Sequence, residues 1–439
     1  MKRRVKNSMN KRNVKIINFE EALKIFSKRK KKFINKKIVK YVNRIISEVK
    51  EKGDSALIKY MKKIDNVELN KEKLIVSKDD IKKAYNKINN EQIKALNFLK
   101  ERIEKIEKQI LSRICFEYLD DEYGLKIKYT YKPIESIGCY IPGGKAAYPS
   151  TVLMTVIPAK IAGVPRIVLC SPPKWNNEIN PMILVAADIC GVNEIYRIGG
   201  AQAIAALAYG TETIKPVNKI VGPGNIYVTI AKMLVSNDVS IDLPAGPSEI
   251  VILADEKANP KYIALDLLSQ AEHDVNSISL LVTTSKLLAE KVSYEIENAM
   301  QSIDNFKIVK KSISKSYIIV CRNIDEALLF INNFAPEHLE IILEKSEEVI
   351  ERILNAGIIL VGENTPVSLT DYCVGTNHVL PTGGYGKTYS GLSVLDYIKR
   401  FCIVECSKNS IEKFKSIAKI LAESEKLKNH YLAIEGRLK

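Results

Sequence analysis

The feature that most constrains the fold is an alternation of short apolar runs and helical stretches, punctuated by glycine turns. Three runs of strand length are each followed by a stretch with helical spacing: Ile167–Cys170 by Pro181–Ile189, Glu194–Ile198 by Ala201–Tyr209, and Lys219–Val221 by Tyr227–Leu234. Another run, Ile137–Ile141, precedes them. Strands that alternate with helices in this way form a parallel sheet covered by helices on both faces. The sequence therefore predicts a doubly wound α/β unit.

A second series of strand candidates follows, separated by helical stretches such as Ala289–Met300 and Ser346–Leu354. The candidates are Ile250–Leu253, Ile278–Thr283, Tyr317–Val320 and Ile358–Val361. We therefore predict an α/β protein with two doubly wound, Rossmann-like units with parallel sheets, and small helical extensions at both ends. In the C-terminal extension, apolar residues recur at helical spacing from Ile417 to Ile434, which predicts one amphipathic helix.

These patterns suggest a division of the chain into a basic arm, two α/β domains and a tail. We assign residues 1–37 to the arm, 38–136 together with 247–392 to the first α/β domain, 137–246 to the second, and 393–439 to the tail. Residues 38–107 have a helical pattern, since Val42, Ile45 and Val49 recur at the spacing of one helix face.

The net charge of +16 first suggests a nucleic-acid partner, but the charge is confined to one end of the chain. Residues 1–40 hold 16 Lys and Arg against two acids, and the rest of the chain is close to neutral. A groove that tracks phosphates is therefore not indicated. The basic arm is interpreted as a solvated terminus, with a transit peptide or a phosphate-binding arm as alternatives.

The apolar runs and the cysteines indicate where the protein resides. No apolar run approaches the roughly 20 residues of a membrane span, and the N-terminus lacks the apolar region of a secretory signal. The eight cysteines contain no C-x-x-C pair, and Cys170 and Cys321 end apolar runs. We interpret them as reduced packing residues and expect a cytoplasmic protein without a membrane partner.

The glycine turns favour an anion-binding function, although no nucleotide fingerprint of the G-x-G-x-x-G type follows a strand. Gly386-Lys387-Thr388 resembles the end of a P-loop, but Pro381 occupies a position where that motif needs glycine. Gly199-Gly200 and Gly222-Pro223-Gly224 each end a strand and open a helix, whose free N–H groups could face an anion. A purely structural role for these turns stays equally open.

Ser269–Asp274 is a polar stretch at the end of a predicted helix that opens at Asn259-Pro260. Asparagine is a good N-cap and proline suits the first helical position. Gln270 and His273 are three residues apart and share a helix face, so they could hold one side of a metal ion. The alternative is a polar helix end with a lone histidine.

The chain has four histidines, and the other three also lie in polar clusters. Pro336 predicts a helix start that places Glu337 and His338 in the first turn, where the helix dipole keeps the imidazole neutral, as a general base requires. Asp371 and His378 bracket a loop, and His430 follows Glu425 in the tail.

Several motifs together resemble the signature of the histidinol dehydrogenases. They are Ile241–Glu249, Ser269–His273, Gly199–Thr211, Gly222–Asn225, Ala335–Leu339 and Gly375–Thr382, within a match from about Ile38 to Leu438. The resemblance implies a zinc-containing homodimer that oxidises L-histidinol through L-histidinaldehyde to L-histidine with reduction of two NAD, as the last steps of histidine biosynthesis.

The resemblance also implies roles for individual residues. One zinc per subunit would be held by Gln270, His273, Asp371 and His430. Glu337 would activate water and His338 would be the base. Substrate contacts would come from Ser248, Gln270, His273, His338, Asp371, Glu425 and His430, with His378 lining the site and the tail reaching the neighbouring subunit. NAD would contact Tyr140, Gln202 and Asn225.

Two positions depart from the family pattern, which usually has Pro-Glu and a Gly before the zinc-binding Asp. Here Val367 follows Pro366, and Thr370 precedes Asp371. These departures leave open a homologous enzyme for another small primary alcohol, such as a dihydroxypropane sulfonate. The Asn377–Pro381 and Ser393–Arg400 stretches favour the histidinol type. A nucleic-acid-associated protein that uses the basic arm is the non-enzymatic alternative, and the near-neutral body argues against it.

Overall fold

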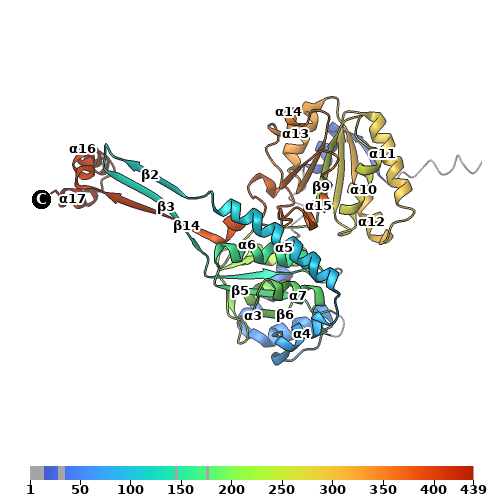
Figure 1. The fold of residues 1–439 in the computed structure, drawn as a ribbon, viewed down its shortest axis with the longest axis horizontal. Coiled ribbons are helices and arrows are strands. Elements are labelled where there is room, and N and C mark those ends of the chain that lie inside the picture. Colours follow the sequence, from blue (N-terminus) through green and yellow to red (C-terminus); the bar gives the residue numbers. More distant parts are fainter. Residues whose placement is uncertain (1–13, 28–34, 144–146, 175–176, 439) are drawn as a thin grey trace, which may run out of the picture.

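The computed structural model describes residues 14–27, 35–143, 147–174 and 177–438. Figure 1 shows two α/β bodies and a projection that carries the C-terminus away from both of them. Each body contains one parallel sheet, with six strands in one and five in the other, and the projection contains a three-stranded antiparallel sheet. This arrangement confirms the predicted α/β class with two parallel sheets.

The six-stranded sheet has the order β1-β11-β10-β9-β12-β13, with all neighbours parallel. Its strands are β1 (Lys15–Asn18), β9 (Glu249–Ala254), β10 (Ile278–Thr283), β11 (Tyr317–Val320), β12 (His338–Ile342) and β13 (Ile358–Val361). One apolar core joins a face of this sheet to α10 (Pro260–Ala271), α11 (Lys286–Ala299), α12 (Phe306–Ile313) and α15 (Val367–Tyr372). A second core joins the other face to α1 (Phe19–Phe26), α13 (Ile324–Phe334) and α14 (Glu347–Ile350).

The five-stranded sheet has the order β6-β5-β4-β7-β8 and is also parallel throughout. Its strands are β4 (Ser136–Tyr140), β5 (Arg166–Ser171), β6 (Glu194–Arg197), β7 (Lys219–Val221) and β8 (Ser240–Ile241). One face carries α4 (Lys78–Tyr85), α5 (Asn90–Leu111), α6 (Pro149–Ala162) and α7 (Pro181–Ile189), and the other carries α3 (Lys36–Tyr60), α8 (Gly200–Tyr209) and α9 (Ile226–Val235). Short helical turns lie at Met61–Asp65, Lys71–Lys73, Tyr385–Lys387 and Val394–Tyr397.

Two parts of the expected domain division differ in the structure. Lys15–Asn18, assigned to the basic arm, forms β1 at the edge of the six-stranded sheet, and Asn18 and Glu21 form a capping box that starts α1. Residues 38–111, assigned with the catalytic domain, pack instead on the five-stranded sheet. The predicted stripe of Val42, Ile45 and Val49 is buried against α8 and its neighbours. The apolar face of α3 predicts that this helix is packed against another element. Which element that is depends on the tertiary fold.

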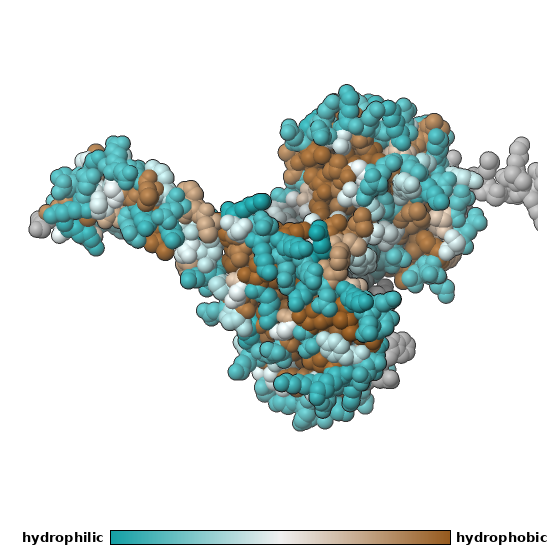
Figure 2. Space-filling view, viewed as in Figure 1, coloured by the Kyte–Doolittle hydropathy of each residue, from teal (hydrophilic) through white to brown (hydrophobic). Residues whose placement is uncertain are grey.

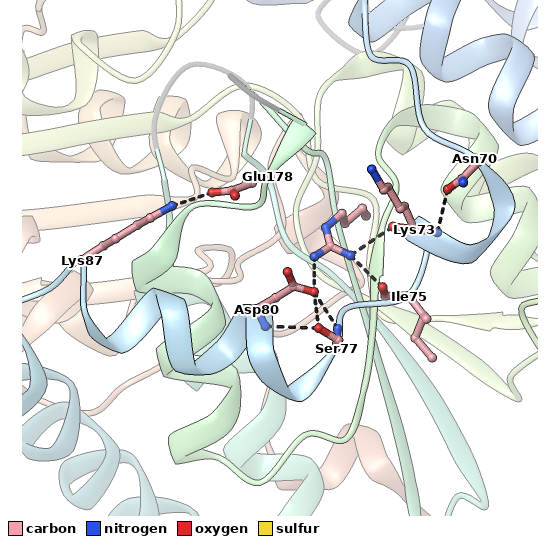
Figure 3. A network of polar contacts seen from close by, with 8 residues as sticks. Asn70, Lys73, Ile75, Ser77, Asp80, Lys87 and Glu178 are labelled. Carbon is pink, nitrogen blue, oxygen red and sulfur yellow. Dashed lines mark hydrogen bonds and ion pairs between the residues drawn. The ribbon is translucent and has the colours of Figure 1, made fainter.

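A buried arginine ties residues 70–87 to this second body. The Arg197 guanidinium donates to the backbone oxygens of Lys73 and Ile75 and pairs with Asp80 at 2.6 Å. Asp80 also accepts hydrogen bonds from Ser77, the N-cap of α4, so one carboxylate satisfies both the cap and the arginine (Figure 3). Hydrogen bonds to charged groups are stronger than neutral ones, which helps to fix α4 against β6.

The projection consists of β2 (Phe116–Asp120), β3 (Leu125–Pro133) and β14 (Ile398–Cys406), followed by α16 (Lys408–Ser424) and α17 (Lys428–Glu435). The prediction of one tail helix from 417 to 434 is therefore wrong. Lys426 has a φ of 59°, and this left-handed residue ends the first helix before the second begins. Apolar side chains of α16, among them Ile417, Ile420 and Leu421, are exposed in the single chain. Figure 2 shows brown, apolar residues among the hydrophilic ones on the projection.

Within the parts of the chain that the structure describes, no helix combines the length and the apolar character needed to cross a bilayer.

Candidate active site

Glu337 and His338 lie at the start of a central strand and not at a helix start, so the predicted local structure is wrong. Ala335 has a φ of 50° and ends α13, after which His338 opens β12 between β9 and β13. Both side chains are buried. The His338 imidazole is still expected to be neutral, but because of burial and not because of a helix dipole. Burial lowers the pKa of His338 to about 4.

The main chain of Glu249 orients both predicted catalytic side chains. Its N–H donates to Glu337 Oε2 at 2.8 Å, and its carbonyl oxygen lies 3.2 Å from His338 Nδ1. A carbonyl oxygen can only accept, so Nδ1 carries the proton and Nε2 has the free lone pair. Among the described residues, Nε2 has no hydrogen-bond partner. The pair thus presents a neutral base beside a carboxylate, with His338 Nδ1 and Glu337 Oε2 3.7 Å apart.

Glu249 itself was not predicted as a site residue. It is the last residue of the Ile241–Glu249 motif and the first residue of β9, where it pairs with Ile278 of β10. Its buried carboxylate accepts a hydrogen bond from the N–H of Gly383 at 3.2 Å. The motif is the only signal for Glu249 in the sequence. Nothing in the motif indicates that the main chain of Glu249 orients Glu337 and His338, which lie 88 and 89 positions later.

Three of the four predicted zinc ligands lie in, or directly after, helices that cover the same face of the six-stranded sheet. Gln270 is in the last turn of α10, which opens at Asn259-Pro260 as predicted, and His273 follows the helix end. Asp371 lies in α15, which packs against α10. Burial lowers the pKa of His273 and raises that of Asp371 to about 7. Within the described residues no group of three or more His, Cys, Asp and Glu side chains is arranged to hold a metal.

His378 joins this region from the loop after α15. Its Nδ1 lies 3.6 Å from Asp371 Oδ1, and its Nε2 lies 3.1 Å from the hydroxyl of Thr151 in α6. The charges of His273 and His378 both lower the pKa of His338, so the three imidazoles are close enough to influence one another. The predicted site residues of three separate segments therefore lie close together, near α6 of the other α/β body.

In the single chain, Glu425 and His430 lie far from this region. Glu425 is the C-cap of α16 and His430 lies in α17, and both side chains are exposed. Figure 1 places both helices at the end of the projection, away from α10 and α15. Ser248 does lie nearby, half-buried directly before β9.

The predicted cofactor residues meet at the carboxyl ends of the five-stranded sheet. The sheet order reverses between β4 and β7, and ligands of such sheets bind in the crevice at this point. Tyr140 ends β4, and its hydroxyl accepts a hydrogen bond from the N–H of Gly200 at 3.2 Å. Gly222 follows β7 with a φ of 110°, and a Cβ there would lie 2.2 Å from the Tyr140 carbonyl oxygen, so only glycine fits.

Gln202 and Asn225 open the two helices at this edge. Gln202 is fully buried, its Nε2 donates to Asp65 at 3.3 Å, and its Oε1 has no partner among the described residues. Asn225 caps α9 by accepting hydrogen bonds from the N–H groups of Tyr227 and Val228. The turns are therefore helix N-termini facing a common edge, as the glycine pattern predicted.

Comparison with known proteins decides the family. A family model described as histidinol dehydrogenase matches residues 28–438. The chain belongs to the histidinol dehydrogenase family. It is 44% identical to the histidinol dehydrogenase of Methanosarcina mazei over 90% of this chain and 91% of that one. Identity to the Methanococcus maripaludis histidinol dehydrogenase is 45%, over 95% of this chain and 97% of the relative.

A solved structure agrees with this assignment. The crystal structure of histidinol dehydrogenase from Elizabethkingia anophelis has a TM-score of 0.88 to this chain at 38% identity, covering 94% of this chain and 96% of that one. The chain is thus an oxidoreductase of histidine biosynthesis, and the predicted histidinol type is confirmed over the alternatives.

The two departures from the usual histidinol dehydrogenase pattern are accommodated locally. Val367 is fully buried in the core between the sheet and α10, and its N–H donates to the carboxylate of Glu340 at 2.8 Å. The Thr370 hydroxyl donates to the carbonyl oxygen of Val367 at 2.6 Å, within the same short helix. Both residues are buried, and the Thr370 hydroxyl has its hydrogen-bond partner within α15 itself.

Proposed function

We propose that this histidinol dehydrogenase oxidises L-histidinol through L-histidinaldehyde to L-histidine and reduces two NAD, with Glu337 and His338 as catalytic residues. The observation that carries the proposal is the pair of contacts to the main chain of Glu249, which leave a neutral His338 with a free Nε2 beside a buried carboxylate. A base of this kind acts at neutral pH without first losing a proton.

Each residue has a defined task in the two oxidations. His338 Nε2 takes the proton of the substrate hydroxyl as a hydride leaves the carbinol carbon, which gives the aldehyde. Glu337 takes a proton from water as the water oxygen adds to the aldehyde carbon, while protonated His338 returns its proton to the carbonyl oxygen, which gives the hydrate. Neutral His338 then accepts a hydroxyl proton of the hydrate as the second hydride leaves, and the protons held by Glu337 and His338 pass to solvent. NAD, when bound, accepts one hydride in each oxidation. The buried position of both residues keeps bulk water from the aldehyde.

The residues present fit a zinc ion. Gln270 offers an amide oxygen, burial lowers the pKa of His273 and so favours its neutral form, and Asp371 is a buried carboxyl whose pKa burial raises to about 7. Oxygen and imidazole donors of this kind suit zinc, which requires them deprotonated. With His430, these residues would hold one zinc per subunit, and the ion would supply positioning of the substrate nitrogens. Ser248 and Glu425 would complete the substrate contacts.

The residues at the β4/β7 switch fit a dinucleotide. Gly222 allows the backbone to approach closely, and the unpartnered Oε1 of the buried Gln202 can accept a hydrogen bond from a ligand. Tyr140, Gln202 and Asn225 would contact NAD from the ends of β4, β6 and β7. This arrangement would use helix N-termini in place of the usual glycine fingerprint.

We also propose a homodimer in which the tail of one subunit completes the active site of its partner. The projection exposes apolar side chains on both its sheet and its helices, including Phe116, Leu119, Val404, Ile417 and Ile420. Several large apolar side chains exposed on one projecting part of a molecule favour an interaction site there. The cytoplasmic location expected from the sequence stays a prediction, and all eight cysteines are free thiols.

The reaction stoichiometry tests the proposed mechanism. We expect two NADH for each histidinol consumed, with little free aldehyde, because Glu337 and His338 act within one buried site. Glu337→Gln should stop most turnovers after the first oxidation, giving closer to one NADH and a trappable aldehyde. NADH absorbance and an aldehyde-trapping reagent in the same assay measure both quantities. A parent yield of one NADH with accumulating aldehyde would reduce the protein to a simple alcohol dehydrogenase.

A further inference from the structure

A second buried carboxyl group lies beside the catalytic residues and has no part in the proposed chemistry. Glu340 is in β12, two residues after His338, so both side chains point to the same face of the sheet. The neighbouring Leu339 and Ile341 pack into the core on the opposite face. Glu340 therefore faces α10 and α15, the helices that carry Gln270 and Asp371.

The hydrogen bond of Glu340 joins β12 to α15, and the carboxyl of Asp266 in α10 lies nearby. Oε1 of Glu340 accepts a hydrogen bond from the N–H of Val367, the first residue of α15, at 2.8 Å. Asp266 of α10 is close enough that its charge helps to raise the pKa of Glu340. Burial is the larger cause, and together they raise that pKa to about 8, while burial raises the pKa of Asp266 to about 6. Oε2 of Glu340 is buried without a partner among the described residues.

Burying a carboxyl group in an otherwise apolar core is unfavourable unless its hydrogen bonds compensate. Glu340 is 2% exposed, and Val367, whose N–H it accepts, belongs to the apolar core on this face of the sheet. A leucine of similar volume would fill this space at less cost. The one interaction that a leucine could not replace is the hydrogen bond to the start of α15, a helix of six residues that ends at Tyr372, next to Asp371.

We propose that Glu340 is a positioning residue for the metal site: it holds the start of α15 against β12, so that Asp371 meets Gln270 and His273. This inference rests on the zinc site proposed above and adds a residue that touches neither metal nor substrate. A short helix that is anchored at its first N–H has little freedom to rotate. The carboxylate of Asp371 on α15 therefore stays in place. Groups that support metal ligands in this way typically contribute 10–100-fold to metal affinity.

The test measures zinc affinity of the full-length chain by competition with a chromophoric chelator, and the visible spectrum after cobalt substitution. Glu340→Leu removes the acceptor for Val367 N–H, and we expect about 10–100-fold weaker zinc binding and an altered cobalt spectrum. Glu340→Gln keeps an acceptor oxygen and mimics the neutral acid, so its affinity should stay close to that of the parent. Glu340→Asp, one methylene too short to reach Val367, should weaken binding like Glu340→Leu and covers the case in which the leucine variant does not fold.

Glu107 provides a matched control. It is also 2% exposed, its Oε2 accepts a hydrogen bond from the N–H of Val394 at 2.7 Å, and burial raises its pKa to about 7. It lies in α5, which carries none of the predicted metal ligands. Glu107→Leu should therefore change the melting temperature without changing zinc affinity, which separates a general effect on stability from positioning of the metal site.

The outcomes distinguish this inference from the proposed function. A parent that binds no zinc overturns the metal site and the role of Glu340 with it. A parent that binds zinc, with Glu340→Leu and Glu340→Asp binding it equally tightly, overturns the role of Glu340 alone. A loss of affinity in Glu107→Leu as large as that in Glu340→Leu would also overturn it, since the effect would then be one of overall stability.

Discussion

The start of β12 and the tail helix α17 hold two parts of one proposed active site in opposite environments. Glu337 and His338 are 7% and 4% exposed, between two neighbouring strands and fixed by the main chain of Glu249. Glu425 and His430 are exposed on a projection, beside apolar side chains that have no cover in the single chain. One part is preorganised by its own fold, and the other has to be organised by a second surface.

This difference separates two ways of setting the chemistry of a side chain. Burial among strands removes water from His338 and lowers its pKa, so the protonation state follows from the core itself. His430 in α17 is exposed, so in the proposed site it would become a metal ligand only after docking on a partner subunit. Stability of the core and completion of the site should therefore respond to different substitutions.

Mixing subunits is the sharpest way to break this comparison, and it has the largest expected effect. His338→Ala and His430→Ala homodimers should each be nearly inactive. In a mixed dimer with the tail exchanged between subunits, one site loses both residues and the other keeps both. Co-expressed mixed dimers, separated by different affinity tags, should recover about half of the parent NADH production, because one of two sites is intact.

The contrary result is equally clear. If each tail served its own subunit, every site in the mixed dimer would lack one of the two residues. Verified mixed dimers without recovery would show that His430 acts in its own chain, and the shared-site proposal would be wrong.

The apolar surface of the tail offers a second, intermediate effect. Ile417 and Ile420 are 57% and 67% exposed, and changing both to lysine places two charges where we expect a subunit contact. The molar mass from light scattering should fall toward that of one chain, and zinc affinity should fall with it. Leu354→Lys is the control, because Leu354 is 77% exposed and lies outside the projection. An unchanged mass for the double variant would place the interface elsewhere.

The smallest expected effect concerns the pH dependence of stability on the buried side of the comparison. The pKa of His338 is lowered from 6.5 to about 4 in the folded chain. Between these values the unfolded chain binds a proton that the folded chain does not, so this stabilising contribution is complete above pH 6.5 and is lost as the pH falls toward 4. The slope is at most about 1.4 kcal/mol per pH unit.

Urea unfolding of the metal-free parent and of His338→Asn at several pH values measures this slope. The free energy of unfolding of the parent should fall more steeply than that of the variant between pH 6.5 and 4. Equal slopes would mean that the His338 imidazole is not held neutral by burial.

The two sheets show how far local sequence patterns reach. Four predicted strands have the same bounds in the structure: Lys219–Val221, Ile278–Thr283, Tyr317–Val320 and Ile358–Val361. Buried parallel strands are continuous apolar runs bounded by turns, so each is recognisable without its neighbours. β1 was missed because its four residues lie within a basic segment, and its pairing with β11 spans about 300 residues of sequence.

The sequence by itself determined the α/β class, the glycine turns and the family, because strand length, turn chemistry and motifs are local properties of the chain. The tertiary structure decided that His338 opens a strand, that Glu249 orients it, and that residues 38–111 cover the five-stranded sheet. It also decided that the tail points away from the site it is proposed to complete. Burial and hydrogen bonding between distant segments set these features, and no local pattern encodes which distant surface a side chain meets.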